Sequence, residues 1–253
     1  MKVSLHKLGI ILLAVVGILT LTNSPASAAF IPADILWVVD TSGSMSGDIA
    51  EVKARIQDFN TAMVNAGIDA NYGLVEFGGN SGNGSNTQTA TLYQDITDYA
   101  TFVAAGGAFS KTDASGGGNE RGSYATLLGL DTATFRSGSV INVILITDED
   151  DDSPLADFNS ADAALTAKNA LFNFIGVPGT GNTNSRYGVL ASNHGGYAFN
   201  INDFRNDPEN FFNTFIEYKV QEITEHSTIP EPASMSLLSM GLLGLAGLRK
   251  KRS

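Results

Sequence analysis

Apolar and polar residues follow one another along the middle of the chain in blocks that predict strands and amphipathic helices. The clearest strand is the uncharged run at residues 35–39, which ends on Asp40. An apolar run without alternation is typical of a strand buried on both faces of a sheet. A helix is predicted next, over residues 47–65. Its apolar residues recur at steps of three and four: Ile49, Val52, Ile56, Phe59 and Met63.

The remaining pattern continues this alternation of strands and helices. Further strands are predicted at residues 71–77, 89–97, 139–148, 171–178 and 197–201, and further helices at residues 98–105, 123–134, 160–172, 187–193 and 208–224. The strand at 89–97 reads as an edge strand. Strands that alternate with helices indicate right-handed crossovers. We therefore predict an α/β fold with a doubly wound, mostly parallel sheet flanked by helices.

The first 28 residues have the pattern of a secretory signal peptide. Two lysines precede an uncharged apolar run at residues 8–22, and Ala26-Ser27-Ala28 fits the small-x-small cleavage rule. The run is shorter than the roughly 20 residues of a membrane-spanning helix. An uncleaved amino-terminal anchor is the alternative. We expect the mature chain to start at Ala29.

The carboxyl end carries three features in a fixed order. Pro230-Glu231-Pro232 precedes an uncharged segment at residues 233–248, and a basic cluster follows at residues 249–252. A short apolar helix with a basic end should stop in the membrane with that end in the cytoplasm. This order resembles the PEP-CTERM sorting signal of Gram-negative bacteria, which implies cleavage by an exosortase. A plain membrane anchor is the alternative for residues 229–253.

Charge changes the picture of the remaining domain, residues 29–228. Six of the 15 basic residues and one of the 26 acidic residues belong to the two end segments, which leaves a net charge of −16 between them. Nucleic acid and anionic membrane surfaces are improbable partners at that charge. Cations are natural counter-partners, although an acidic surface also serves solubility. The chain has no cysteine, so disulfides and thiol chemistry play no part.

A candidate site follows from two predicted strands that end on aspartates, Asp40 and Asp148. Parallel strands present their carboxyl ends at one edge of a sheet, where open α/β sheets place their ligand sites. Ser42 and Ser44 follow Asp40 in the pattern D-x-S-x-S. Helix capping would explain one of the serines but not Asp148. Converging carboxylates are costly without a cation, and oxygen ligands suit Mg²⁺, Mn²⁺ or Ca²⁺.

This combination resembles the von Willebrand factor type A (vWA) domain and its metal-ion-dependent adhesion site. The resemblance implies the Rossmann-like vWA fold and one divalent cation, most often Mg²⁺. Asp40, Ser42, Ser44 and Asp148 match the family's ligands in the first loop and after the fourth strand. The resemblance further implies that an acidic group of a partner completes the coordination of the ion, which is binding and not turnover.

The middle loop departs from the common family pattern, which places a threonine after paired glycines. Here the loop reads Gly-Gly-Gly-Asn119-Glu120. Asn119 takes the threonine's position in one alignment, whereas Glu120 fits a variant with a glutamate ligand. We favour Glu120, because a carboxylate binds a hard cation better than an amide. The alternative for Glu120 is an ordinary acidic residue in the first turn of its helix.

Enzyme motifs are incomplete. Asp40-Thr41 lacks the second copy of an aspartic protease, and His194-Gly195 lacks the downstream serine of a subtilase. We expect His194 to be a surface loop residue, and the acidic run at residues 149–152 to be a solvated loop and not a second cation site.

We therefore predict a non-enzymatic, exported binding protein of the cell surface or extracellular matrix. Its partner would be a protein or polysaccharide that supplies an acidic group to the metal. The alternatives are a structural matrix component with a vestigial metal site and, third, a secreted hydrolase.

Overall fold

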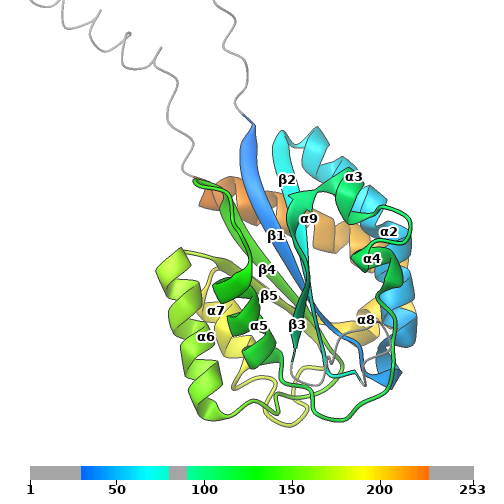
Figure 1. Ribbon diagram of the computed structural model, residues 1–253, viewed down its shortest axis with the longest axis vertical. Helices are drawn as coiled ribbons and strands as arrows, with labels where there is room; N and C mark the ends of the chain where they lie inside the picture. The colour runs from blue at the N-terminus through cyan, green and yellow to red at the C-terminus, as the bar shows by residue number, and fades with distance from the viewer. Residues whose placement is uncertain (1–29, 80–89, 228–253) are drawn as a thin grey trace, which may run out of the picture. The chain divides into compact units, whose positions relative to one another are not determined.

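A six-stranded sheet forms the centre of the domain (Figure 1). The computed structural model describes residues 30–79 and 90–227. The strand order is β3-β2-β1-β4-β5-β6, and only β3 is antiparallel to its neighbour. The strands are β1 (Ile31–Asp40), β2 (Ile68–Phe77), β3 (Thr91–Asp98), β4 (Val140–Ile146), β5 (Leu171–Gly176) and β6 (Ala198–Asn200). The predicted doubly wound, mostly parallel sheet is confirmed, including the edge position of β3.

Strand β1 is buried on both faces, as its apolar run predicts. Ile35, Trp37 and Val39 belong to one hydrophobic core, whereas Leu36 and Val38 belong to the other. Successive side chains of a strand point to opposite faces, so a strand between two helical layers needs apolar residues at every position. The central position of β1 fixes the end of the strand, Asp40, at the middle of the sheet edge.

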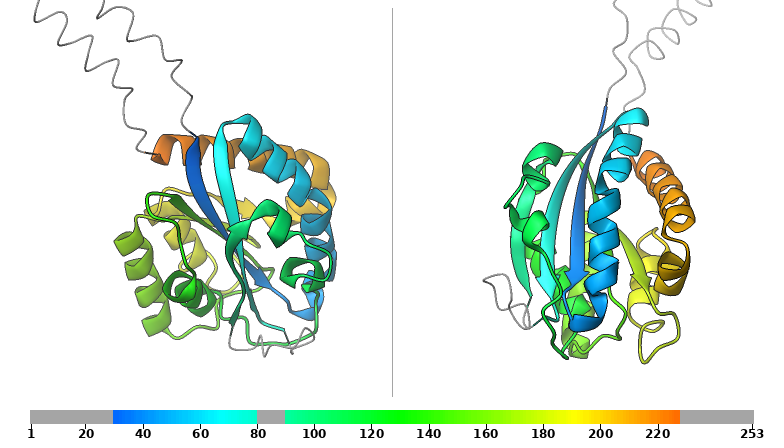
Figure 2. Two further views of the ribbon diagram at one scale, coloured as in Figure 1. Left: turned by 45° about the horizontal axis from the view of Figure 1, so that its top comes forward. Right: turned by 90° about the vertical axis from the view of Figure 1, so that its right-hand side faces the viewer.

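Two layers of helices cover the sheet (Figure 2). Each layer packs on one of the two cores. On the first face lie the 3₁₀ helix η1 (Gly43–Met45), α2 (Ser46–Asn65), α3 (Tyr99–Phe102), α4 (Ala108–Lys111), α8 (Ile201–Asn206) and α9 (Pro208–His226). On the second face lie α5 (Gly122–Thr132), α6 (Leu155–Lys168) and α7 (Tyr187–Asn193).

Helix α2 follows its predicted pattern closely. All five of the apolar residues that recur at steps of three and four are buried against the first face. Burial of such a stripe, at about 25 cal/mol per Å² of apolar surface, supplies most of the stability of an amphipathic helix in a protein. The helix starts directly after the DTSGS loop, so its packing holds that loop against the sheet.

A polar cluster anchors α9 within the first core. Lys219 is fully buried and donates to Glu222 Oε1 at 2.7 Å. Asn142 of β4 and Asn173 of β5 donate to the same oxygen. Burial lowers the pKa of Lys219 to about 8, and Glu222 opposes that shift. The cluster ties the last helix to two central strands.

Several element boundaries differ from the sequence prediction. Helix α6 begins at Leu155 and ends at Lys168, whereas residues 160–172 were predicted. Its first turn was missed because Leu155 is 60% exposed and gives no periodic apolar signal. The short helices α4 and α8 were not predicted, and Ile201, the first residue of α8, was assigned to a strand. Asn200 caps α8 by accepting from the backbone N–H of Asn202, a local polar contact that periodicity does not detect.

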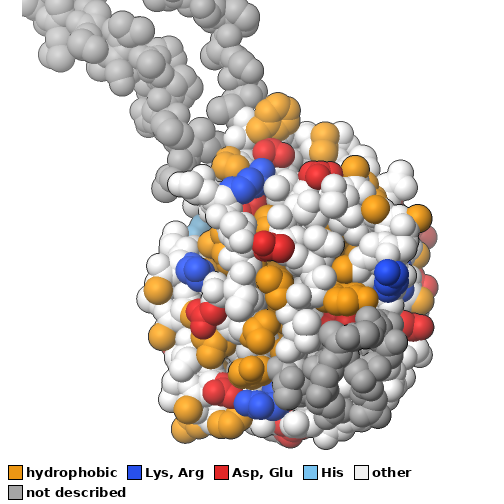
Figure 3. Space-filling view, in the orientation of Figure 1, with side chains coloured by type: hydrophobic (Ala, Val, Ile, Leu, Met, Phe, Trp, Pro, Cys, Tyr) orange, Lys and Arg blue, Asp and Glu red, His pale blue; other side chains and the backbone are white. Residues whose placement is uncertain are grey.

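Several predictions lie outside the described residues, namely the signal peptide, most of a glycine-rich loop that the sequence predicts at residues 78–86, and the carboxyl-terminal apolar segment. Within the described ranges no helix is long and apolar enough to cross a membrane. Figure 3 shows one face of the domain, on which the described lysine and arginine side chains stand apart from one another. That face therefore offers no basic patch of the kind that binds nucleic acid.

Candidate metal site

The two predicted aspartates meet at the carboxyl edge of the sheet. Asp40 is the last residue of β1, and Asp148 follows the end of β4 by two residues. These strands are parallel neighbours, with Val39 paired to Ile146. The strand ends therefore bring both carboxylates to one edge, as the sequence predicts.

A chain of polar contacts joins the first loop to Asp148. Asp40 Oδ1 accepts from the backbone N–H of Ser42 at 2.8 Å. The hydroxyl oxygens of Ser42 and Ser44 lie 3.3 Å apart. Ser44 Oγ then donates to Asp148 Oδ1 at 2.9 Å. Four of the five predicted site residues are thus connected.

The serines do not act as helix caps. Ser42 occupies the N-cap position of η1, and Met45 that of α2, and neither side chain makes a capping hydrogen bond. The helix starts without the side-chain acceptor that the capping interpretation requires. Both hydroxyls are turned to the cluster of oxygens instead.

The middle loop lies directly against the first loop. Ser115 N donates to Thr41 O at 2.9 Å. A methyl group at Gly43 would lie 3.5 Å from Gly116 Cα. The two loops are therefore so close that a side chain at this position would contact the middle loop. The predicted convergence of the middle loop on this edge is therefore present.

Gly78, at the end of β2, shows how close Glu120 is to Asp40. A methyl group at Gly78 would lie 2.4 Å from Asp40 Oδ1 and 3.3 Å from Glu120 Cγ. Both acidic side chains therefore approach the same point. Gly78 has a φ of +80°, a conformation that side-chain-bearing residues rarely adopt. Only glycine leaves room here for the two carboxylates.

Of the two middle-loop candidates, Glu120 is the one turned inward. Glu120 is 6% exposed, whereas Asn119 is exposed. The backbone of Glu120 is fixed by Asp152, because Asp152 Oδ2 accepts from Glu120 N and Asp152 N donates to Glu120 O. This pair of contacts holds the middle loop to the loop after β4.

Burial shifts both inner carboxyls toward the neutral form. Asp40 is fully buried, and its pKa rises to about 6, mainly through desolvation and despite hydrogen bonds from Ser42 and Thr147. The pKa of Glu120 rises to about 7, through desolvation first and the charge of Asp40 second. Asp148 adds to the shift of Asp40, and Asp40 adds to that of Glu120, so the like charges at this edge disfavour one another's ionised form.

The donor set fits a hard divalent cation only if the hydroxyls take part. Within the described ranges, no three acidic, histidine or cysteine side chains lie close enough to hold a metal ion by themselves. The carboxylates of Asp40, Glu120 and Asp148 and the hydroxyls of Ser42 and Ser44 are all oxygen donors. Mg²⁺ and Mn²⁺ prefer such donors, and Mg²⁺ usually keeps several waters. The residues present fit that ion.

The acidic run after β4 is only partly the solvated loop that the sequence predicts: Glu149 and Asp152 are exposed, whereas Asp151 is buried. The side chain of Asp151 is fully buried and accepts from Ser123 N, Ser123 Oγ and Ser153 N. Asp150 and Asp152 accept from the backbone of Asn182 and Glu120. These carboxylates hold loops and the start of α5, so they are already engaged.

Sequence reasoning missed three residues around the site. Thr147 Oγ1 donates to Asp40 Oδ2 at 2.7 Å. Asp48 in the first turn of α2 is 3% exposed and binds the guanidinium of Arg205. Arg205 Nη2 also donates to Asp148 Oδ2 at 2.8 Å. Thr147 could have been noted as the neighbour of Asp148, but nothing in the sequence connects Arg205 to a site 57 residues earlier.

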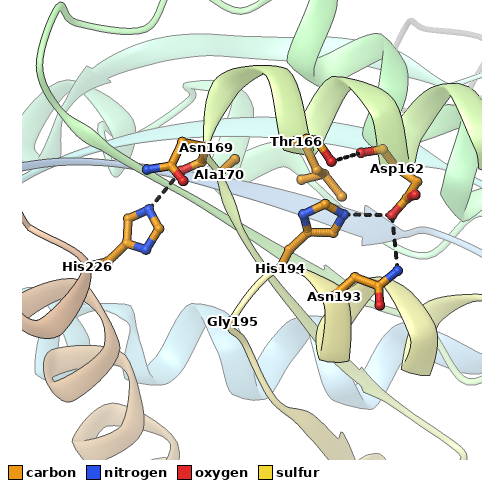
Figure 4. Close-up of a pocket in the computed structure, with 9 residues that line it drawn as sticks. Asp162, Thr166, Asn169, Ala170, Asn193, His194, Gly195 and His226 are labelled. Carbon is orange, nitrogen blue, oxygen red and sulfur yellow. Dashed lines mark hydrogen bonds and ion pairs between the residues drawn. The ribbon is translucent and has the colours of Figure 1, made fainter.

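A pocket lies away from this edge of the sheet (Figure 4). Its volume is about 470 Å³, and Asp162, His194 and His226 are among its lining residues. His194 Nε2 lies 2.7 Å from Asp162 Oδ1, and its side chain is only 7% exposed. His194 lies in the turn after α7, as a loop residue should, but its side chain is largely buried and joins α7 to α6.

The fold and the oxygen-lined edge together define a Rossmann-like α/β domain with a polar site at the strand ends. The sequence model of the von Willebrand factor type A domain matches residues 34–214, and the chain belongs to this family. The PEP-CTERM protein-sorting motif matches residues 228–252. Comparison with curated proteins gave no match.

Solved structures share the fold. The conserved hypothetical protein BatB from Bacteroides thetaiotaomicron is 17% identical, with a TM-score of 0.52 over 77% of this chain and 98% of that chain. A von Willebrand factor type A protein from Catenulispora acidiphila is 18% identical, with a TM-score of 0.52 over 76% of this chain and 43% of that chain. At these identities the likeness concerns the fold alone.

Proposed function

We propose that this chain is an exported binding protein that takes an acidic group of its partner with the help of one divalent cation. Asp40, Ser42, Ser44, Glu120 and Asp148 would hold the ion. A bound Mg²⁺ would offer an open coordination position to a carboxylate, and Mn²⁺ or Ca²⁺ are the alternatives. The partner would be a protein or a polysaccharide.

The observation that carries this proposal is the approach of Asp40 and Glu120 to one point inside a buried environment. Burial of two like charges is unfavourable unless a cation compensates them. A purely structural matrix role leaves this arrangement unexplained, because a neutral pair would fold at lower cost. The uncapped serines support the same conclusion.

Each residue has a distinct task in this proposal. Thr147 and the backbone of Ser42 orient the Asp40 carboxylate. Asp152 fixes the backbone of Glu120. Ser44, which is exposed, lies at the entrance and bridges to Asp148. The inner residues would bind the ion, and the exposed side of Ser44 is where a partner would approach.

Export follows from the sorting motif, and its details are part of the proposal. The motif marks the chain as an exported protein of a Gram-negative bacterium. We infer removal of residues 1–28 by signal peptidase, transient anchoring in the inner membrane and processing by an exosortase. Delivery to the cell surface or the extracellular matrix follows. The chain is proposed to be a binding protein and not an enzyme.

Retention on isolated extracellular matrix tests this function. The full-length chain in mild detergent is incubated with the matrix, either with Mg²⁺ or with a chelator. The proposal expects retention with Mg²⁺, release by the chelator, and loss of retention in Asp40→Asn. Asp150→Asn serves as the matched control with the same charge change. Equal retention with and without Mg²⁺ would contradict the proposal.

A further inference from the structure

Arg205 of α8 is held in a fixed position at the rim of the site. Its Nε donates to both carboxylate oxygens of Asp48, at 3.0 and 3.1 Å, and its Nη2 donates to Asp48 Oδ2. Asp48 is 3% exposed. A forked contact with a buried carboxylate fixes the plane of the guanidinium, so Asp48 sets the orientation of Arg205.

From this position Arg205 reaches the predicted site. Its Nη2 also donates to Asp148 Oδ2, the oxygen of Asp148 that does not accept from Ser44. Asp148 is thus held by the Ser44 hydroxyl at one carboxylate oxygen and by the guanidinium at the other. Arg205 is therefore adjacent to the site without occupying its centre.

Part of the guanidinium remains available. The side chain of Arg205 is 36% exposed, and Nη1 donates to no residue of the described part of the chain. Arg205 also lines a pocket of about 330 Å³ that reaches Ser44 at the site and has Phe204 and Pro208 in its wall. It is the only basic residue among those that line this pocket, and the two acidic residues there, Asp48 and Glu51, pair with Arg205 and Arg55.

Arg205 is a positive charge in a strongly acidic domain. The domain between the end segments carries −16, and Glu120 adds a carboxylate where the family commonly has a threonine. That field repels an acidic partner, and Glu120 weakens the pull that a bound cation exerts on it. A fixed guanidinium at the rim restores a local attraction for a carboxylate.

We propose that Arg205 is a specificity-determining residue that receives the second oxygen of the partner's carboxylate. This inference rests on the proposed function and names its ligand class: a carboxylate, read by the ion and by Arg205 Nη1 together, with the adjoining group in the pocket beside Ser44. The guanidinium discriminates against neutral and basic groups. Lysine cannot replace it, because one ammonium cannot satisfy Asp48 in the forked geometry and also reach the partner.

The test uses acetate as the probe and Mn²⁺ as the reporter. The full-length chain in mild detergent is loaded with Mn²⁺, and the relaxation of the acetate methyl protons by bound Mn²⁺ gives the acetate affinity. Arg205→Gln should weaken acetate binding about tenfold or more, the loss expected for one charged hydrogen bond. The affinity for Mn²⁺ itself should not fall, because a positive charge is removed.

Two further variants control for misfolding and for the loss of one positive charge. Arg205→Gln leaves Asp48 buried without its partner, so Asp48→Asn/Arg205→Gln should show the same loss of acetate binding in a better-folded protein. Lys168→Gln removes a positive charge at the end of α6, on the other face of the sheet, and it should bind acetate like the wild type. With chelator present, Arg205→Gln should melt lower than the double variant, which reports on the Asp48 contact without any metal.

The outcomes separate the two proposals. If the wild type binds no Mn²⁺, the proposed function fails. If Mn²⁺ binds and acetate affinity is unchanged in both Arg205 variants, the role of Arg205 is overturned while the metal site stands. The tripeptide Gly-Asp-Gly and galacturonate then present the carboxylate from a peptide and from a sugar. Arg205→Gln must weaken whichever binds, and an unchanged affinity again overturns the inference.

Discussion

Asp40 is the residue on which the account depends. It is fully buried at the end of the central strand, and its pKa rises to about 6 because burial disfavours the charged form. Ser42 and Thr147 hydrogen-bond to it and favour the charged form, but they do not offset the burial. A buried carboxyl group with a raised pKa and no cationic partner is typical of a functional site.

The first prediction concerns the pH dependence of stability without metal. Native Asp40 holds its proton more tightly than the unfolded chain, so the folded state binds more protons between pH 4 and 6. The free energy of unfolding therefore falls as the pH rises through that window. The difference between 3.8 and about 6 corresponds to roughly 3 kcal/mol at most. Glu120, with a pKa of about 7, extends the fall toward neutral pH.

Denaturant unfolding at pH 4 to 7 in chelator, for the wild type and Asp40→Asn, measures this effect. Carboxylates away from Asp40 contribute equally to both proteins, so the difference between them reports Asp40 together with its effect on Glu120. The advantage of the variant should grow with pH. With saturating Mg²⁺ the wild type should instead gain stability as the pH rises, because protons compete with the ion. Parallel curves in both conditions would exclude the account.

The second prediction distinguishes the two candidates of the middle loop. Glu120 is buried beside Asp40, whereas Asn119 is exposed. Glu120→Ala should weaken Mg²⁺ and Mn²⁺ binding by about tenfold or more, as loss of a charged ligand does, and Asn119→Ala should leave it nearly unchanged. Calorimetric titration decides between them. The reverse order would assign the role to Asn119.

At the scale of elements, the loop after β4 organises the start of α5. Arg121 occupies the N-cap position of α5 and makes no side-chain cap, whereas Asp151 accepts from Ser123 N and Ser123 Oγ. Asp152 then ties the same loop to Glu120. The acidic run thus supplies the cap from a distant part of the chain and positions a candidate ligand at the same time.

The third prediction follows from this cap. Asp151→Ala should lower the free energy of unfolding by about 1 to 3 kcal/mol, because buried N–H and O–H groups lose their acceptor. Asp150→Ala is the control and should cost less, since Asp150 accepts one long hydrogen bond of 3.3 Å. Trp37 is the only tryptophan and is fully buried, so its fluorescence reports unfolding. Equal losses in the two variants would argue against the cap.

The sequence predicted the long elements well and the short ones poorly. The apolar run of β1 and the stripe of α2 carry strong periodic signals, and both were found where expected. Helices α4 and α8 are too short to show a period, and the first turn of α6 is exposed. Asp40 and Asp148 could be paired because parallel strands share an edge. The Asp48–Arg205 contact could not, since it joins residues 157 positions apart through side chains alone.

At the scale of the whole molecule, the domain combines a strongly acidic composition with the proposed cation site. The net charge of −16 between the end segments raises the local concentration of divalent ions at the surface. The sorting motif covers residues 228–252, and the vWA match ends before it, at residue 214. The sorting motif and the proposed binding site therefore lie in separate parts of the chain.

The fourth prediction concerns processing. The protein recovered from the culture should lack residues 1–28 and the tail after Pro-Glu-Pro, because both end segments read as sorting signals. Its intact mass should lie well below the 26.6 kDa of the precursor. Mass spectrometry of the secreted and cytoplasmic fractions tests this, and recovery of the full-length chain alone would contradict it.

The most direct test of the central claim is a set of four melting curves: wild type and Asp40→Asn, each with Mg²⁺ and with chelator at pH 7. Asparagine keeps the volume of Asp40 and can accept from Ser42 N, so packing is preserved. Metal should stabilise the wild type by roughly 2.7 kcal/mol at one hundred times its dissociation constant. The variant should lose that gain and, in chelator, melt no lower than the wild type, because one of two repelling charges is gone. Coincident wild-type curves at saturating Mg²⁺ would contradict the metal site.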